Sequence, residues 1–386
     1  MIIEIRQAGF VNKGAELMLR AAVQKIRERY PDAKITMAPA WGGSENTFEK
    51  MRELDLYPKA WLWRKGIDFG EIANFLPNKT LLKRYGLVFN NEIDVVIDAA
   101  GFSYSDQWGI NSSKELSSSS KRWRKNGTKL IMLPQALGPF EDKEIQKYVK
   151  IWAKNADLIF PRESDSYQYL TNIVGQHNKI KQYSDFTNLV EGTLPEGYDA
   201  SDKRIALVPN YRMIDMTNKE EGDAYLPFMI RCAKYLVSQN KQPFVLVHEG
   251  NNDRMLAEKI SEATGGIPIV IENDCLHIKG ILGSCDATIG SRFHGLVSAL
   301  SQGVPSLATG WSHKYLRLFE DYAFTDGLVS VLDSDEHLHQ KIDLLIRPES
   351  SFVLKRQLMK RSDELKLLSE EMWQLVFTEI DQVNSK

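Results

Sequence analysis

The chain has 386 residues, of which 43% are hydrophobic and 26% charged, and its 49 basic and 51 acidic residues leave a formal net charge of −2. This length accommodates two ordinary domains, each with its own core. The balanced charge excludes the overall basic character of a nucleic-acid-binding protein, and charges interrupt every apolar run, which excludes a membrane-spanning helix.

Cysteine usage and the first residues indicate a cytoplasmic protein. The three cysteines, Cys232, Cys275 and Cys285, lack the spacing of metal ligands, and their odd number argues against a disulfide framework. We expect Cys275 and Cys285 to be small buried residues, because they flank an apolar segment. Met1–Ile5 enters a strand directly, so no signal peptide is predicted.

A strand, a glycine loop and a helix open the chain. Ile2–Arg6 alternates as a strand does, and Glu16 starts an amphipathic helix. The loop between them contains Gly9, Asn12, Lys13 and Gly14. Such a loop usually brings its backbone close to a ligand, although the spacing is not that of a Walker loop. A tight turn without a ligand is the alternative interpretation. Lys34–Ala38 is the second predicted strand.

Residues 41–90 interleave aromatic with basic side chains, among them Trp41, Phe69, Phe75, Lys65 and Arg84. This mixture occurs at membrane interfaces, where it meets anionic head groups. We favour a segment that packs its aromatic rings in a core and solvates its charges.

Three short apolar runs, Ile93–Ala99, Lys129–Pro134 and Leu158–Phe160, predict buried parallel strands. Ile180–Ser184 is predicted as the last strand of this half. In an open α/β sheet, ligands bind beyond the carboxyl ends of the strands. The polar residues delivered there are Asp98, Tyr104, Asp106, Gln107, Gln135 and Arg162.

Between two of these strands, Asn111–Asn126 contains four successive serines and then a basic run, Lys121–Lys125. Two interpretations stay open. The run is either a basic surface that attracts a diphosphate or an anionic lipid, or a solvated helix end where the helix dipole favours cations.

A polar linker, Glu191–Lys203, separates two α/β series. Three strands of the second series are predicted at Ile205–Pro209, Pro243–His248 and Ile267–Ile271, with helices between them. We therefore predict an N-terminal Rossmann-like domain over residues 1–196 and a C-terminal one over residues 197–350. A final helix in residues 351–386 is expected to pack back on the N-terminal domain. The fold class is α/β, with two doubly wound domains.

The stretch Asp286–Tyr315 predicts a binding site. Ser291-Arg292-Phe293-His294 lies between the strand Ala287–Ile289 and a helix. Free N–H groups at a helix start favour an anion, to which Arg292 adds a guanidinium and His294 a group that titrates near neutrality. The cluster Ser312-His313-Lys314 follows the next strand, Ser306–Thr309, and should return to the same crevice. The alternative is that Arg292 and His294 are satisfied turn residues.

The chain resembles the polysaccharide pyruvyl transferase family. The matching residues are Gly290–His294, Gly303-Val304-Pro305 and Gly310–Tyr315, with Gly9 and Asn12–Glu16 at the opening loop and Ala156-Asp157, Arg162-Glu163-Ser164 and Leu170 in the middle. The resemblance implies a glycosyltransferase-B-like architecture, in which the two domains face a central cleft. The N-terminal domain is then the expected acceptor side and the C-terminal domain the phosphoenolpyruvate side.

The implied activity is transfer of the pyruvyl group of phosphoenolpyruvate to two hydroxyls of one sugar in a surface polysaccharide or its precursor, which gives a cyclic ketal. Expected catalytic residues are His294, Arg292 and Asp98. The expected donor-binding residues are Arg162, Arg292, Phe293, His294, Ser312, His313 and Lys314. The expected acceptor-binding residues are Asn12, Lys13, Glu16, Tyr104, Asp106, Gln107 and Gln135. The general base stays open between His294 and a carboxylate such as Asp98 or Glu16. The scheme needs no metal or cofactor.

Two other classes stay open: a nucleotide-sugar-dependent glycosyltransferase of the same architecture, and a non-catalytic glycan-binding protein. The expected partners are phosphoenolpyruvate and a saccharide that is either polymeric or lipid-linked, with no nucleic acid. A peripheral contact with the inner face of the cytoplasmic membrane is part of the lipid-linked case. The oligomeric state stays open.

Overall fold

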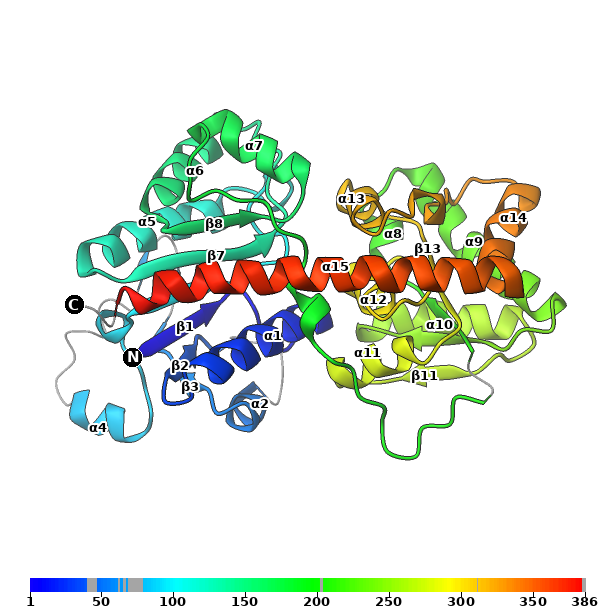
Figure 1. Ribbon diagram of the computed structural model, residues 1–386, viewed down its shortest axis with the longest axis horizontal. Helices are drawn as coiled ribbons and strands as arrows, with labels where there is room; N and C mark the ends of the chain where they lie inside the picture. The colour runs from blue at the N-terminus through cyan, green and yellow to red at the C-terminus, as the bar shows by residue number, and fades with distance from the viewer. Residues whose placement is uncertain are drawn as a thin grey trace. The chain divides into compact units, whose positions relative to one another are not determined.

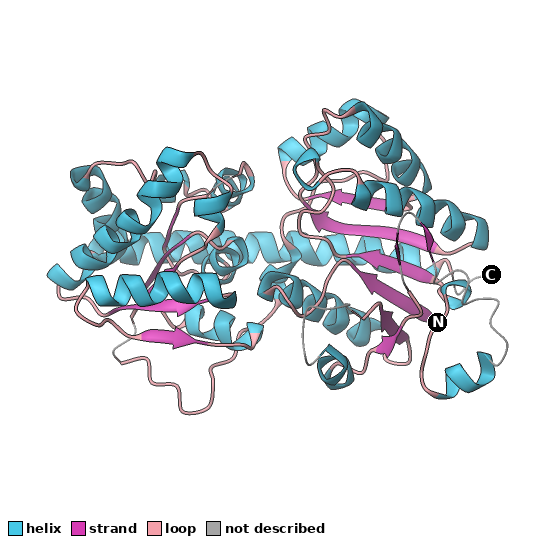
Figure 2. Ribbon diagram, turned by 180° about the vertical axis from the view of Figure 1, so that it is seen from behind, coloured by secondary structure: helices cyan, strands magenta, loops and turns pink. Residues whose placement is uncertain are grey.

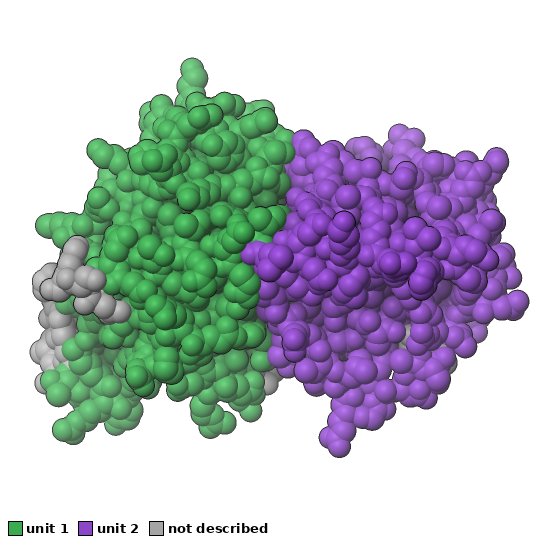
Figure 3. All heavy atoms as spheres, viewed as in Figure 1, with its two compact units in different colours: residues 1–186, 368–386 green, residues 187–367 purple. Residues whose placement is uncertain are grey.

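The structure is a computed structural model that describes residues 1–39, 47–61, 63–64, 67–68, 79–201, 204–310 and 312–383. The chain divides into two compact units (Figure 3), unit 1 with Met1–Phe186 and Leu368–Lys386, and unit 2 with Thr187–Leu367. The predicted core packing of Trp41, Phe69 and Phe75 falls outside the described residues.

Unit 1 contains a six-stranded parallel sheet in the order β3-β2-β1-β6-β7-β8 (Figure 1). The strands are β1 (Ile2–Arg6), β2 (Lys34–Met37), β3 (Tyr57–Pro58), β6 (Val95–Asp98), β7 (Lys129–Gln135) and β8 (Leu158–Pro161), and β4 (Trp63–Arg64) pairs with β5 (Ile67–Asp68) separately. The helices are α1 (Lys13–Arg29), α2 (Thr47–Glu53), α4 (Lys79–Arg84), α5 (Asn111–Asn126), α6 (Lys143–Asn155) and α7 (Ser164–Val174).

The order of the strands fixes where the helices of unit 1 lie. The chain moves from β1 to β2 in one direction and from β6 through β7 to β8 in the other. Right-handed crossovers therefore place α1 on one face of the sheet and α5 and α6 on the opposite face. α5 and α6 cover their face through an apolar cluster that includes Leu116, Trp123, Val149 and Trp152.

Unit 2 contains a five-stranded parallel sheet in the order β11-β10-β9-β12-β13. Figure 2 shows the strands of both units in magenta with cyan helices around them. Its strands are β9 (Ile205–Val208), β10 (Pro243–Val247), β11 (Ile269–Ile271), β12 (Ala287–Gly290) and β13 (Ser306–Ala308). Its helices are α8 (Arg212–Asp215), α9 (Lys219–Ser238), α10 (Gly250–Ala263), α11 (Cys275–Gly283), α12 (Phe293–Leu300), α13 (Lys314–Asp321) and α14 (Asp335–Ile346).

The central strand β9 shows why these strands read as continuous apolar runs. Ile205 and Leu207 join the apolar core on one face of the sheet, whereas Ala206 and Val208 join the core on the other face. Both faces of a doubly wound sheet are covered by helices, so consecutive residues of alternating direction are all buried. The cysteines are also as expected, since Cys232, Cys275 and Cys285 are buried and free of disulfides.

The last helix, α15 (Pro348–Asp381), contributes to both units, because the division falls at Leu367 and Leu368. In unit 1, Tyr30 donates a hydrogen bond to Asp381 at 2.8 Å, and Phe186 packs edge-on against Trp373 with ring centroids 6.1 Å apart. Within the described ranges, no helix combines the length and apolar character needed to cross a bilayer.

One local prediction is wrong. Ile180–Ser184 lies beside β8, where the amides of Lys181 and Tyr183 donate to the carbonyl oxygens of Ile159 and Pro161. Only Ile180 forms a β-bridge, with Ile159, and the residues after it do not continue as a strand. Gln182, which would share a face of the strand with Ile180, is exposed, so the alternation does not bury a second residue against the sheet. The N-cap of α7 is Glu163, whose carboxylate accepts from the amide of Ser166.

Candidate active site

The strand ends of unit 2 meet at the point where the strand order reverses. The chain runs from β9 to β10 on one side and later to β12 on the other side of β9. Doubly wound sheets bind ligands beyond the carboxyl ends of the strands at such a switch point. Asn210 and Ser291 follow β9 and β12 respectively, so both lie at this position.

The turn after β12 is fixed by buried hydrogen bonds. The carbonyl oxygen of Ser291 accepts from the side-chain amide of Asn210 at 2.7 Å and from the hydroxyl of Tyr315 at 2.8 Å. The Ser291 and Tyr225 hydroxyls lie 2.9 Å apart. These contacts come from four separate segments of unit 2, which makes the backbone before α12 a rigid support for the residues that follow.

Arg292 is the N-cap residue of α12 and is held by two carboxylates. Its Nε donates to Asp253 at 2.8 Å, and its two terminal nitrogens lie 2.6 Å from Asp253 and 2.6 Å from Glu249. A guanidinium has five N–H donors, so these contacts leave two for a further acceptor. The side chain is 14% exposed and therefore reaches solvent. The two carboxylates therefore orient the guanidinium and leave part of its hydrogen-bonding capacity unused.

Asp253 was not predicted as a site residue. It is fully buried in α10, and it also accepts from the backbone amide of Tyr211 at 3.0 Å. Burial raises its pKa to about 6, although Arg292 and the amide of Tyr211 act in the opposite direction. The available signal was weak: Asp253 follows the strand-end residue Glu249 by four positions, a spacing that places both on one side of a helix start.

The next residues of α12 place an aromatic ring and an imidazole together. Phe293 and His294 stack edge-on with ring centroids 5.3 Å apart, and Phe293 meets Tyr315 in the same way at 5.9 Å. Lys314 lies 5.5 Å from the centroid of the Phe293 ring, which is a cation–π contact. The predicted cluster after β13 is thus brought to the start of α12 at least through Lys314 and Tyr315.

Two further predicted residues belong to the same edge of unit 2. Ser312 lines a cavity of about 470 Å³ together with Thr309, Glu221 and Asp333. His313 is the N-cap residue of α13 and is partly buried.

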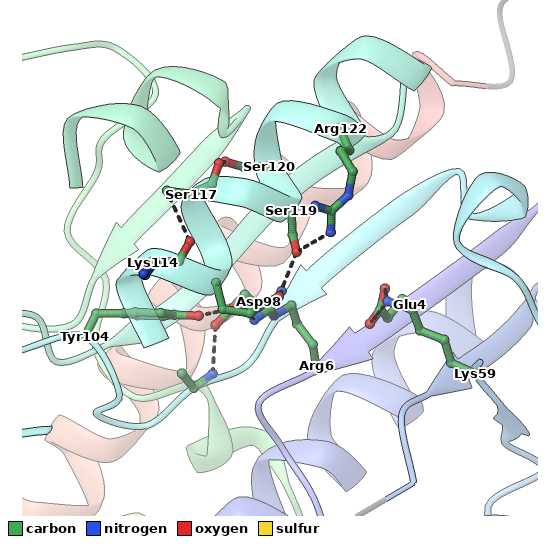
Figure 4. A network of polar contacts seen from close by, with 12 residues as sticks. Glu4, Arg6, Lys59, Asp98, Tyr104, Lys114, Ser117, Ser119, Ser120 and Arg122 are labelled. Atoms are coloured by element: carbon green, nitrogen blue, oxygen red, sulfur yellow. Dashed lines mark hydrogen bonds and ion pairs between the residues drawn. The ribbon is translucent and has the colours of Figure 1, made fainter. Parts of the chain in front are cut away.

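In unit 1, the predicted residues Asp98, Tyr104 and Gln135 are buried and form one network with Arg6. Figure 4 shows Asp98 between Tyr104 and Arg6. Asp98 accepts from the Tyr104 hydroxyl at 2.6 Å and from the side-chain amide of Gln135 at 3.4 Å, and its carboxylate lies 3.1 Å from Nε of Arg6. Arg6 stands directly opposite Asp98 in the pairing of β1 with β6, and it also forms an ion pair with Glu115. Burial raises the pKa of Asp98, against the effect of Arg6. This carboxylate therefore holds its neighbours in place.

The opening loop forms a cluster of charges at the start of α1. Glu16 is fully buried and lies 3.1 Å from both Lys13 and Lys50 and 3.4 Å from Arg20. Asn12 caps the helix by accepting from the amide of Ala15 at 3.0 Å. Lys50 of α2 was not predicted, because only the tertiary structure brings it to Glu16.

The remaining predicted residues of unit 1 differ in exposure. The Asp106 carboxylate accepts from the backbone amides of Glu141 and Asp142 at 2.7 and 3.1 Å, which gives it a structural role. Gln107 is exposed. Arg162 is 3% exposed and donates to Asp185 at 3.1 Å.

The sequence was compared with models of known protein families. Residues 12–313 match the family model described as polysaccharide pyruvyl transferase. The match spans both units and includes each predicted site residue except Lys314.

Similar solved structures support the fold. HepE from Anabaena, solved in complex with UDP and glucose, aligns with a TM-score of 0.58 at 11% identity, covering 98% of this chain and 99% of HepE. The UDP-GlcNAc 2-epimerase from Neisseria meningitidis bound to UDP-GlcNAc has a TM-score of 0.59 at 9% identity, with 98% and 99% covered. A UDP-glucosyltransferase from Polygonum tinctorium has a TM-score of 0.56 at 10% identity, with 97% of each chain covered. The predicted fold class, two Rossmann-like domains of glycosyltransferase-B-like type, is confirmed.

Proposed function

Because the chain belongs to the polysaccharide pyruvyl transferase family, we propose that it transfers the pyruvyl group of phosphoenolpyruvate to two hydroxyls of one sugar in a surface polysaccharide or its precursor. The product is a cyclic ketal, and inorganic phosphate leaves. The observation that carries this proposal is the arrangement at the start of α12, where Arg292 is oriented by two carboxylates and followed by His294.

Phosphoenolpyruvate carries a phosphate and a carboxylate close together. A guanidinium suits these groups because its donors form a planar fork. We propose that the two remaining N–H groups of Arg292 bind the phosphate and the carboxylate of phosphoenolpyruvate. The backbone amides at the start of α12 assist them. Ser312, His313, Lys314 and Arg162 complete the proposed donor set, and Lys314 supplies positive charge as phosphate leaves.

The reaction adds one proton at C3 of the enol and removes one proton from each attacking hydroxyl. One of these two protons returns to the base that protonated C3, and the other leaves with the inorganic phosphate. His294 can supply the first and, once neutral, accept a proton from a hydroxyl. Asp98 and Glu16 were the other candidates for the base. Both are fully buried and are held by cations, which favours positioning roles for them. We therefore assign proton transfer to His294.

The proposed acceptor-binding residues stay the same seven. Their contacts in the structure separate residues that can reach a saccharide from residues that support the loops. Gln107 is exposed and is therefore available to a saccharide, whereas Asn12 caps α1 through the amide of Ala15. The other members of the set support the surrounding loops through the contacts described above. They are Lys13, Glu16, Tyr104, Asp106 and Gln135. The scheme uses no metal or cofactor. We place the reaction in the cytoplasm, with a lipid-linked precursor as one form of the acceptor.

A nucleotide-sugar-dependent glycosyltransferase is the second candidate, because the structures compared above include UDP complexes of similar fold. Thermal denaturation with phosphoenolpyruvate or UDP separates the two. A ligand at a hundredfold excess over its dissociation constant stabilises a protein by about 2.7 kcal/mol. We expect phosphoenolpyruvate to raise the melting temperature and UDP to leave it unchanged; the opposite result would replace the proposal by the second candidate.

Two variants then test the roles of the residues. His294→Ala should lose transfer by at least about 100-fold while phosphoenolpyruvate still stabilises the protein, because a general acid contributes about 10²–10⁴-fold. Arg292→Ala should lose that stabilisation as well. Calorimetry gives donor binding, and phosphate release with a saccharide acceptor gives transfer. An active His294→Ala variant would remove the acid from the scheme, and unchanged donor affinity in Arg292→Ala would remove the anion site.

A further inference from the structure

The two helices that cover one face of the unit 1 sheet carry most of their charge as cations. α5 has five basic residues and one acidic residue, and α6 has four basic residues and one acidic residue. The whole chain has slightly more acidic than basic residues, so this concentration is local. The acidic residue of α5, Glu115, is buried against Arg6 and does not reach the surface.

The cations of α6 lie along one line. Lys143, Lys147, Lys150 and Lys154 follow one another at intervals of four, three and four residues, which keeps them on a single side of a helix. All four are exposed, and the apolar residues on the opposite side of α6 are buried in the core. Ion pairs with other described residues are absent for these four lysines.

α5 repeats the pattern beside it. Lys114, Lys121 and Lys125 are exposed and share one side of the helix at intervals of seven and four residues. The helices lie next to each other (Figure 1), and the side-chain amide of Asn155 donates to Ser120 across the contact. Within the described part of the chain, these three lysines also lack an ion pair. The α5–α6 lysine face is defined here as these seven lysines.

A cavity with apolar walls adjoins one end of this face. It has a volume of about 380 Å³, and Ile173 and Val174 form part of its wall, while Lys150, Lys154 and Lys179 contribute the cations. Lys179 is tied to the end of α6, because its ammonium donates to the carbonyl oxygens of Lys154 and Ala156 at 3.0 and 2.8 Å. Cations beside an apolar wall suit a ligand that has an anionic group next to an apolar part.

We infer that the α5–α6 lysine face binds an anionic lipid bilayer. Two adjacent helices of about 20 and 24 Å in length offer a broad surface to a plane of head groups. A soluble polyanion would need the charges only, whereas the adjoining cavity also accepts part of an acyl chain or a glycerol backbone. The inference deepens the proposed function by naming the surface through which a lipid-linked acceptor is approached. It rests on that proposal for its role in the reaction, not for the binding itself.

The experiment measures binding to vesicles without substrate, so its result is independent of pyruvyl transfer. The full chain is sedimented with vesicles of phosphatidylcholine alone or with one quarter phosphatidylglycerol. We expect binding only to the anionic vesicles, and loss of binding in 1 M salt, where the screening length is about 3 Å.

The test variant replaces Lys147, Lys150 and Lys154 of the face by Gln. The matched control replaces Lys234, Lys259 and Lys360 of unit 2, which are equally exposed, by Gln. Each lysine near an anionic membrane contributes about 5-fold in partitioning, so the test variant should bind about 100-fold more weakly and the control as the original chain does.

Three results would overturn the inference: no binding of the original chain to anionic vesicles at low salt, equal loss in the test and control variants, or binding of heparin without binding of vesicles. A circular dichroism spectrum of each variant confirms that it is folded. Since the substitutions are exposed, unfolding is not expected.

Discussion

Asp253 and Arg292 show how a buried carboxylate and a guanidinium are balanced at the start of α12. Arg292 contacts Asp253 through two nitrogens, and yet burial keeps the pKa of Asp253 near 6. The cost of burying the charge thus exceeds what the ion pair and the amide of Tyr211 return. The pair orients Arg292 for an anion, and the orientation has a cost in stability at neutral pH.

This balance predicts a specific pH dependence. The pKa of Asp253 is higher in the folded state than in the unfolded state, so its contribution to stability is present below about pH 4 and is lost as pH rises through about 6. In Asp253→Asn this dependence is absent. Relative to the variant, the original chain should lose about 2 kcal/mol of unfolding free energy between pH 4 and pH 7. Denaturant titrations of both proteins at the two pH values measure the difference. A difference that stays constant, or rises with pH, would mean that Arg292 dominates.

The elements follow from the sequence where a strand is buried on both faces. β1 is found at the predicted bounds, and β7, β9, β10 and β12 differ from the predictions by a residue or so, because their apolar runs are bounded by polar residues, proline or glycine. The start of α12 was predicted for the same reason: Gly290 ends a strand and an apolar helical pattern follows. The prediction of a strand at Ile180–Ser184 is wrong because one buried apolar residue next to exposed ones is not enough to continue a sheet.

The polar contacts of the site could not be predicted in this way. Three pairs of residues become neighbours only through strand order and helix packing. They are Asp253 with Arg292, Lys50 with Glu16, and Glu115 with Arg6. Arg6 with Asp98 is an intermediate case. Both residues end strands, and the pairing of β1 with β6 makes them neighbours, but a sequence alone does not fix the order of strands.

The turn between β13 and α13 gives a prediction about an element. A Cβ atom added at Gly310 would lie 2.2 Å from the ring of Tyr315, whose hydroxyl binds the Ser291 carbonyl. Gly310→Ala should therefore displace that ring and destabilise the protein by about 1–3 kcal/mol, with weaker donor binding because the support of α12 shifts. Gly9→Ala is the matched control, since nothing lies within 4 Å of the added atom. Equal melting temperatures for the two variants would show that Tyr315 moves without cost.

At the scale of the whole molecule, the chain returns to unit 1 after completing unit 2. The observed division lies at Phe186 and Thr187, whereas the polar linker had suggested residues 196 and 197. Residues 187–196 belong to unit 2 because the backbone there packs on α11: Thr193 donates to the carbonyl oxygen of Leu276, and a Cβ atom at Gly192 would lie 2.4 Å from the backbone of Gly280. The polar composition of the linker predicted which residues are exposed. It did not predict the residue at which the chain stops packing on unit 1 and starts packing on unit 2.

The end of α15 is therefore expected to be essential for the stability of unit 1. Trp373 is fully buried, stacks on Phe377 with ring centroids 5.7 Å apart and packs against Phe186. Truncating a buried tryptophan to alanine costs about 3–5 kcal/mol, because the neighbouring rings do not fill the space. Leu367→Ala in the same helix is the control, since Leu367 is 67% exposed and its loss should change stability by less than about 0.5 kcal/mol. Calorimetric scans of both variants measure the effect, and a Trp373→Ala protein as stable as Leu367→Ala would show that unit 1 folds without the last turns of α15.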